Sequence, residues 1–331
     1  MRYFVSGIAL VAALAAAGCG RSAKVEAVSG TDHAMAIDVR QRNWNSDHSS
    51  GLELSSEHYR IYTTTTNRSL RRYLPGFMEA AHSHYLELTG LSDLPKAERM
   101  TIYMMASRAE WAALTRKVFG RRSGAALSIE AGGYCHRGIC VFWNMGGLGT
   151  LSVAAHEGLH QFFHHRLRDR LPMWLEEGLC TTMEGYEIHD GTVRFTPLRN
   201  IIRFGDLRTA IVQDRWIELP GLLAMDSAQA VAGQPTERAV GYYGQLWALV
   251  RYIRSVPEYR KGMLSLLADA AAGRLNEAMN VPPEALATLR LRGRIYNRTV
   301  SEPLFRYYVT DDLETFSRRY KAFAKKLARL E

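Results

Sequence analysis

Two histidines and a glutamate at a short, fixed spacing are the residues of this chain best suited to chemistry. His156 and His160 bracket the run His-Glu-Gly-Leu-His. On an α-helix, residues four apart lie on one face, so both imidazoles point the same way and can share one Zn²⁺ ion. Glu157 follows His156 directly, where a carboxylate can take the proton of a water that zinc activates. The spacing therefore predicts a zinc site with a general base beside it.

A catalytic zinc usually has three protein ligands and one open position, so a third ligand must come from another segment. Pro172 can begin a second helix, because the N–H that proline lacks is not needed in the first turn. That helix carries Glu176 and Glu177, and we expect Glu177 to be the ligand. Glu184 lies seven residues further on about the same helical face. We expect it to hydrogen-bond the free nitrogen of a ligand histidine.

These two segments together resemble the gluzincin metallopeptidases, most closely the aminopeptidase and leukotriene-hydrolase-like group. The likeness covers roughly residues 150–186. It consists of His-Glu-x-x-His, then Trp-Leu-x-Glu-Gly, then a glutamate seven residues further on. The resemblance implies a zincin-like fold and a Zn²⁺ cofactor. It also implies His156, His160 and Glu177 as zinc ligands, Glu157 as the general base and Glu184 behind the ligands.

The same resemblance predicts an oxyanion donor and a peptide-binding strand, and one missing signature argues against aminopeptidase activity. Gluzincins often place a tyrosine or histidine from a later helix over the zinc, to hydrogen-bond the oxyanion. Tyr243 is the candidate here and Tyr242 the second choice, with packing of both tyrosines as the alternative. A strand within residues 131–144 is expected to bind extended peptide at the sheet edge, or else to form an ordinary core hairpin. The amine-binding Gly-x-Met-Glu-Asn signature is absent at 146–149, which argues against aminopeptidase activity.

The N-terminus is typical of an export signal. Arg2 gives a basic start, residues 8–17 are apolar but too short to span a bilayer, and small residues lead to Cys19. This resembles a bacterial lipoprotein signal, in which residues 1–18 are removed and Cys19 is lipidated. Ordinary signal cleavage nearby is the alternative. We expect residues 19–50 to tether the protein to the membrane, facing the periplasm or the exterior of the cell envelope.

The composition is that of an ordinary globular protein. The chain has 331 residues, of which 47% are hydrophobic and 23% charged. Its formal net charge is +9, but the basic residues are scattered and no nucleic-acid motif is present. We therefore expect a solvated basic surface, no nucleic-acid partner and a monomer.

The pattern of apolar residues predicts an α+β fold that positions the site. Strands expected at 58–64 and 100–105 alternate with helices at 69–88 and 108–119, which indicates a mixed sheet with helices against it. The zinc helix is expected from Thr150, as its N-cap, to Arg168. We assign 51–190 to the sheet and the zinc-binding helices and 191–331 to a mainly helical C-terminal half.

Within the C-terminal half, residues 188–236 read as irregular. A strong helix is expected from Val240. The amphipathic stretch at 311–330 is expected to dock as a helix, with binding to a membrane surface as the alternative.

Three cysteines remain beside Cys19. Cys135 and Cys140 lie five apart across a turn-like stretch, and in an oxidising compartment they could form a hairpin disulfide. A metal site that uses both cysteines and His136 is the rival interpretation. Cys180 is expected to pack as a small buried hydrophobe.

Three other histidines are possible metal ligands by residue type. His82 and His84 are two residues apart and so lie on different faces of their helix, which is poor spacing for zinc. We expect both on the surface. His164 lies one turn beyond His160 and is a weaker candidate ligand than Glu177.

The combined expectation is a zinc peptidase that hydrolyses peptide bonds of a peptide or protein substrate. The alternative is an inactive envelope lipoprotein that binds peptides or proteins through the same cleft. A hydrolase of another amide, such as a cell-wall peptide cross-link, is a third possibility.

Overall fold

The computed structural model describes residues 6–7, 37–47, 49–93, 98–130, 132–225, 235–279, 282, 284 and 293–330. Cys19, nearly all of the expected signal peptide and most of the expected tether lie outside these ranges. Among the helices described, none combines the length and apolar character that crossing a membrane requires.

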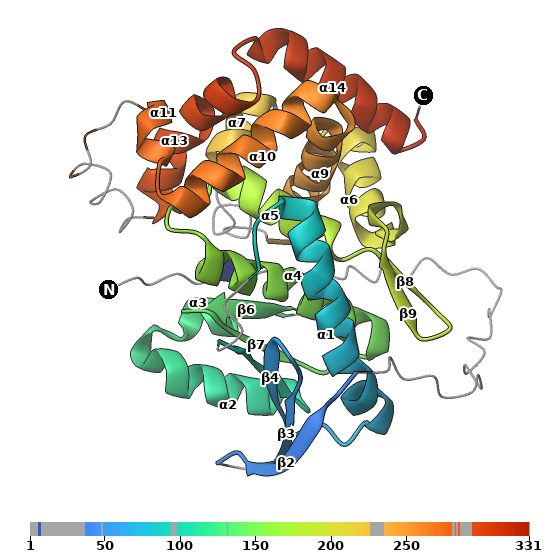
Figure 1. Cartoon of the computed structure of the whole chain (residues 1–331). Helices are drawn as coiled ribbons and strands as arrows, with labels where there is room; N and C mark the ends of the chain where they lie inside the picture. Colours follow the sequence, from blue (N-terminus) through green and yellow to red (C-terminus); the bar gives the residue numbers. More distant parts are fainter. Residues whose placement is uncertain are drawn as a thin grey trace, which may run out of the picture.

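The fold is built on one mixed sheet and one separate hairpin (Figure 1). The strands are β1 (Ser6–Gly7), β2 (Arg40–Asn45), β3 (Ser50–Ser55), β4 (Tyr59–Thr63), β5 (Met100–Met105), β6 (Gly133–His136), β7 (Ile139–Trp143), β8 (Tyr186–His189) and β9 (Thr192–Phe195). The sheet order is β1-β6-β7-β5-β4-β3-β2, and β8 pairs only with β9. The pairs β4–β5 and β5–β7 are parallel and the others antiparallel.

Helices connect the parallel strands and form most of the described part of the C-terminal half. They are α1 (Arg68–Thr89), α2 (Arg108–Phe119), α3 (Gly124–Leu127), α4 (Gly147–Arg166), α5 (Met173–Thr182), α6 (Ile201–Val212), α7 (Leu219–Ala224), α9 (Pro235–Ser255), α10 (Pro257–Ala272), α11 (Leu275–Met279), α13 (Gly293–Tyr308) and α14 (Leu313–Leu327). In Figure 1, α4 and α5 lie between the sheet and the helices of the C-terminal half. The α+β class and the mixed sheet expected from the sequence are therefore confirmed.

Strand β7 shows why the sheet is covered on both faces. Cys140 and Phe142 point into the core shared with α1 and α4, whereas Val141 and Trp143 point into a second core with α2. Side chains alternate along a strand, so a strand buried on both faces has an unbroken apolar run. The run from Ile139 to Trp143 has this pattern.

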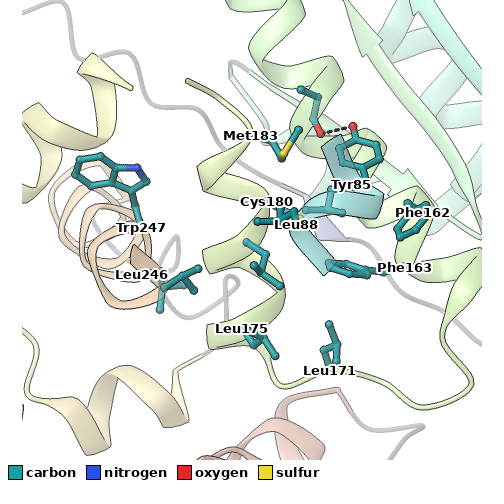
Figure 2. Close-up of a cluster of buried hydrophobic side chains, with 14 of the residues drawn as sticks. Tyr85, Leu88, Phe162, Phe163, Leu171, Leu175, Cys180, Met183, Leu246 and Trp247 are labelled. Atoms are coloured by element: carbon teal, nitrogen blue, oxygen red, sulfur yellow. Dashed lines mark hydrogen bonds between the residues drawn. The ribbon is translucent and has the colours of Figure 1, made fainter. Parts of the chain in front are cut away.

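Close helix packing holds α4 and α5 in place. Figure 2 shows side chains of α1, α4, α5 and α9 meeting in one cluster, with Tyr85 of α1 donating a hydrogen bond of 2.7 Å to the carbonyl of Ala155. A Cβ at Gly158 would lie 2.5 Å from the Tyr85 hydroxyl, and one at Gly178 would lie 2.4 Å from Val250 of α9. The glycines of both motif segments therefore allow α1 and α9 to approach the site closely.

Several boundaries differ from the sequence expectations. Helix α4, which carries the two motif histidines, begins at Gly147 and not at Thr150, because Gly146 makes the turn with φ 92°. Thr150 lies inside the helix, where its hydroxyl donates to the Gly146 carbonyl at 2.7 Å. The helix ends at Arg166, before the expected Arg168.

The expected tether and the expected irregular segment also contain regular structure. Strand β2 pairs with β3 along its whole length, so residues 40–45 belong to the sheet although they precede the boundary placed at 51. The stretch 188–236 contains β9, α6 and α7. Some of the breaking residues lie in connections, such as Asp190 and Gly191 between β8 and β9, whereas Gly205 and Gly221 lie inside α6 and α7.

Two further expectations can be compared with the described residues. Cys135 and Cys140 are register partners across β6 and β7, but both are free thiols, so the disulfide is not formed in this structure. Helix α14 docks on the protein, because Phe316 and Tyr320 are buried and the Tyr320 hydroxyl donates to the Gln245 carbonyl at 2.7 Å.

Candidate metal centre

The two motif histidines meet at one point on α4. The Nε2 atoms of His156 and His160 lie 3.2 Å apart, and their ring planes are inclined by 53°. Both side chains are buried. The spacing argument from the sequence therefore gives the correct relative placement of the two rings.

Helix α5 brings Glu177 to the same point. Its Oε2 atom lies 3.5 Å from Nε2 of His156 and 3.6 Å from Nε2 of His160. Glu176 turns elsewhere, with its Oε1 2.8 Å from Nδ1 of His160. The choice of Glu177 over Glu176 as the residue facing both Nε2 atoms agrees with this placement.

Each histidine is held from behind by a carboxylate. Glu184 accepts from Nδ1 of His156 at 2.8 Å, as expected, and Glu176 does the same for His160. No pattern in the sequence predicted this role for Glu176. A neutral histidine that donates from Nδ1 carries its lone pair on Nε2, so both rings present an acceptor to the centre.

These residues fit a divalent metal of the zinc class. Two Nε2 atoms and one carboxylate oxygen converge at 3.2 to 3.6 Å. When both rings are neutral and donate from Nδ1, all three atoms are acceptors, and they repel one another unless a cation lies among them. Four-coordinate zinc with bonds of about 2.0–2.2 Å places neighbouring ligand atoms about 3.4 Å apart. Both oxygens of the buried Glu177 also lack a hydrogen-bond donor.

Arg203 of α6 fixes the carboxylate behind His156. Its Nε and Nη2 donate to the two oxygens of Glu184 at 2.8 and 2.9 Å, and Nη1 donates to Asp206 at 2.9 Å. Burial alone would raise the pKa of Glu184, but the Arg203 charge and the hydrogen bond to His156 outweigh it and lower the pKa to about 2. No local spacing in the sequence pointed to Arg203, because it lies far along the chain from both motifs.

Glu157 stands beside the centre. It is fully buried, and within the described part of the chain neither of its carboxylate oxygens has a hydrogen-bond donor. Burial raises its pKa to about 7, against the lowering effect of His160 and His156. A carboxyl group in this state is suited to accept and return a proton near neutral pH.

The two tyrosines of α9 are distinguished by their partners. The Tyr242 hydroxyl donates to the Met225 carbonyl at 3.3 Å. The Tyr243 hydroxyl is buried and has no hydrogen-bond partner among the residues that the structure describes. The Arg203 guanidinium lies 5.0 Å from the Tyr243 ring centroid. Burial, together with the nearby Glu177 carboxylate, raises the pKa of Tyr243 well above its usual value.

Cys180 is closer to the centre than expected. It is buried as predicted, but its Sγ and one nitrogen of each motif histidine all lie within 4.8 Å of one another. The sequence holds a signal for this placement, because Cys180 follows Glu177 by three residues on α5 and residues at that spacing share a helix face. Burial raises the pKa of the thiol, whereas the neighbouring histidines lower the pKa of Glu177 to about 2 against its own burial. Glu177 is therefore the better third donor.

His164 faces away from this group. It is exposed, and a Cβ at Gly138 in the β6–β7 turn would meet its ring at 2.6 Å. His164 therefore lies against that turn and not beside Glu177.

Comparison of the sequence with protein-family models and with curated proteins finds no match.

Proposed function

We propose that this protein is a zinc-dependent peptidase of the gluzincin kind, with a zincin-like fold. One observation carries the proposal: His156, His160 and Glu177 converge as three acceptors, with the unpartnered Glu157 carboxylate beside them. Metal ligands next to a buried general base are the parts that metal-assisted hydrolysis requires.

The role of each residue follows from its contacts. Bound zinc would lower the pKa of a water and polarise the scissile carbonyl. His156, His160 and Glu177 would hold the metal, while Glu184 and Glu176 keep both rings in the tautomer that presents Nε2. Glu157 would accept a proton from the attacking water and return it to the leaving amine.

Tyr243 has a separate part in this proposal. Its hydroxyl would donate to the oxyanion that develops on the substrate. The absence of a hydrogen-bond partner in the structure leaves that donor available.

The sheet offers one edge to an extended substrate. Strand β7 is interior, since it pairs with β5 on one side and β6 on the other. The outer side of β6 pairs only with the two-residue strand β1, antiparallel, at Cys135 and Tyr134. Strand β1 belongs to the segment that signal cleavage would remove. We propose that peptide adds to β6 at that edge, within the expected range 131–144.

The expected location is part of the same proposal. Export through residues 1–18 and lipidation of Cys19 would anchor the protein in the bacterial cell envelope, where it would act as a monomer on peptide or protein substrates. The apolar run that ends in small residues before Cys19 supports this.

The burial of the centre favours one alternative. Glu157 and Glu177 are fully buried, so a substrate carbonyl must gain access to them. An envelope protein that keeps the metal and binds a peptide or protein partner without turnover would not need such access.

Metal content of the purified chain is the first test. His156→Ala and Glu177→Ala should each lose one equivalent of zinc relative to the wild type, because each removes a ligand. Cys180→Ala should keep it. A folded wild-type chain that retains no metal after zinc is supplied would contradict the proposal. Zinc loss in Cys180→Ala would mean that Cys180 is a fourth ligand and that the site has no open position for water.

Turnover separates the enzyme from the binder. Glu157→Gln should reduce cleavage of a fluorogenic peptide library by about 10²–10⁴-fold while zinc content stays unchanged. Glu87→Gln, an exposed change on α1, is the matched control. A wild-type protein that binds zinc but cleaves no more than Glu157→Gln would favour the binder.

A further inference from the structure

A second group of metal-ligating side chains lies outside the centre described above. His58 precedes β4, His82 lies on α1, and Asp93 follows α1. His82 is 1% exposed, so the surface position expected from the sequence is wrong. The rings of His58 and His82 stack, with centroids 3.9 Å apart and planes inclined by 15°. We call these three residues the outer cluster.

The donor atoms of the outer cluster face one another. Nε2 of His58 lies 3.5 Å from one carboxylate oxygen of Asp93, and Nε2 of His82 lies 3.3 Å from the other. One donor atom of each residue falls within 4.8 Å of the other two. These two nitrogen–oxygen distances already match the separation of about 3.4 Å between neighbouring ligand atoms of a four-coordinate metal.

Glu79 fixes the orientation of His58. Its carboxylate lies 2.6 Å from Nδ1 of His58 and also accepts from the His58 backbone N–H at 2.9 Å. A neutral His58 that donates from Nδ1 must present a lone pair at Nε2, facing the Asp93 carboxylate. Two acceptors facing each other require a cation between them or a proton on the ring.

His82 provides an independent sign. Among the described residues its buried Nε2 has no hydrogen-bond partner, although it lies 3.3 Å from an oxygen of Asp93. Leaving a buried nitrogen in this state is unfavourable, and a metal ion would satisfy it.

We propose that His58, His82 and Asp93 form a second site for a first-row divalent metal, with zinc as the probe to test it. Two imidazoles and a carboxylate suit such an ion, and Glu79 would hold His58 as an outer carboxylate holds a metal ligand. Binding requires the stacked rings to rotate so that their Nε2 atoms converge. The metal would join the segment before β4, helix α1 and the segment after α1.

The ion has a way in from solvent. An open pocket of about 660 Å³ is lined by His58 and Glu79, together with Ser56 and Arg99. The Asp93 side chain is 48% exposed, so solvent also reaches its carboxylate.

A proton is the competing explanation. An imidazolium at His58, between Glu79 and Asp93, would give the same distances with no metal. The two explanations differ in whether the chain takes up zinc at these residues.

The test is a zinc titration of the whole chain in the His160→Ala background, which removes the first site. Calorimetry with elemental analysis should find one equivalent of zinc still bound. Asp93→Asn and His58→Gln should each weaken that binding at least about tenfold. His84→Ala is the control, because His84 lies on the same helix but contacts Glu87. Zinc should raise Tm in the background chain and not in its Asp93→Asn derivative.

The wild-type chain provides a second measurement if the background variant folds poorly. It should bind two equivalents, and its Asp93→Asn variant one. A background chain that binds no zinc, or Asp93→Asn and His58→Gln variants that bind it as tightly as their parent, would overturn the proposal and leave the proton in its place. None of these readouts depends on peptidase activity, so failure here leaves the proposed function untouched.

Discussion

Two histidine–carboxylate clusters in this chain use similar donors on different supports. The inner cluster of His156, His160 and Glu177 takes both histidines from one helix and its carboxylate from the next. The outer cluster takes one donor from a turn, one from a helix and one from the segment after that helix. The inner donors are all buried, whereas the Asp93 carboxylate is half exposed.

The difference lies in how firmly the donors are held. Each inner ring is tied through Nδ1 to a carboxylate, and Glu184 is tied in turn to Arg203. In the outer cluster, Glu79 ties His58, but the His58 and His82 rings still lie in a stack that metal binding must open. Preorganised ligands suit catalysis, where geometry must not change with occupancy. Adjustable ligands suit a site that stabilises the fold when filled.

The largest effect is expected at Arg203, which holds the carboxylate of Glu184 behind the inner cluster. Arg203→Met removes the guanidinium and leaves the Glu184 carboxylate buried without its main countercharge. We expect urea unfolding of the metal-free chain to show a loss of about 3–5 kcal/mol. Arg306→Met, which removes exposed pairs with Glu302 and Asp311, should cost much less than Arg203→Met, because solvent screens both pairs. Equal losses would mean that the inner cluster has no special anchor.

The next effect concerns the oxyanion donor. Tyr243→Phe removes a hydroxyl that has no other partner, so kcat should fall about 10²–10³-fold while zinc content and KM change little. Tyr242→Phe removes only a hydrogen bond to the Met225 carbonyl and should leave kcat within a few-fold of the wild type. If the Tyr243 change lowers stability but not kcat, the residue only packs.

The two clusters also show what a sequence can predict. The inner histidines are four apart on one helix, and Glu177 lies on a second helix with clear start and motif residues. Local spacing therefore placed them, as it placed β5 and α2 at their observed bounds. His58, His82 and Asp93 are brought together by the pairing of β4 with β5 around α1, which no local period encodes. The spacing of His82 and His84 predicted a surface position for His82, but the side chain is buried.

The same limit applies to the parts of the inner centre that were missed. Arg203 reaches Glu184 from a segment that read as irregular, and Glu176 was weighed only as a rival of Glu177. Thr150 was a reasonable N-cap by residue type, but Gly146 made the turn earlier because its backbone can adopt a positive φ.

A third prediction uses pH to probe the burial of the inner centre. The pKa of Glu157 rises from an ordinary 4.5 to about 7, so the metal-free folded state holds this proton more tightly than the unfolded chain does. Protonated Glu157 therefore contributes to the free energy of unfolding. This contribution is complete below about pH 4.5 and is lost as the pH rises through 7. Glu157→Gln abolishes that loss.

The measurement is urea unfolding of the metal-free wild type and Glu157→Gln at pH 5 and pH 8. The advantage of the variant should be larger at pH 8 by about 2.5 kcal/mol. Titrating groups that do not interact with Glu157 are common to both chains and cancel in this difference. An equal advantage at both pH values would mean that Glu157 is solvated in the metal-free protein.

The smallest effects test whether the clusters are independent. Glu176→Gln and Glu79→Gln each alter the carboxylate that orients one histidine through Nδ1, at 2.8 and 2.6 Å. A glutamine oxygen can still accept that hydrogen bond, but it gives up the negative charge. We expect each change to weaken zinc at its own cluster about tenfold, measured against a competing chelator.

Helix α1 gives a reason to measure both clusters in each variant. It carries His82 of the outer cluster and, three residues on, Tyr85, whose hydroxyl bonds the carbonyl of Ala155 next to His156. If α1 is rigid, each substitution should leave the other cluster's affinity unchanged, because sites that share no partner behave additively. Weakening of both clusters by Glu79→Gln alone would show instead that α1 transmits the state of the outer cluster to the inner one.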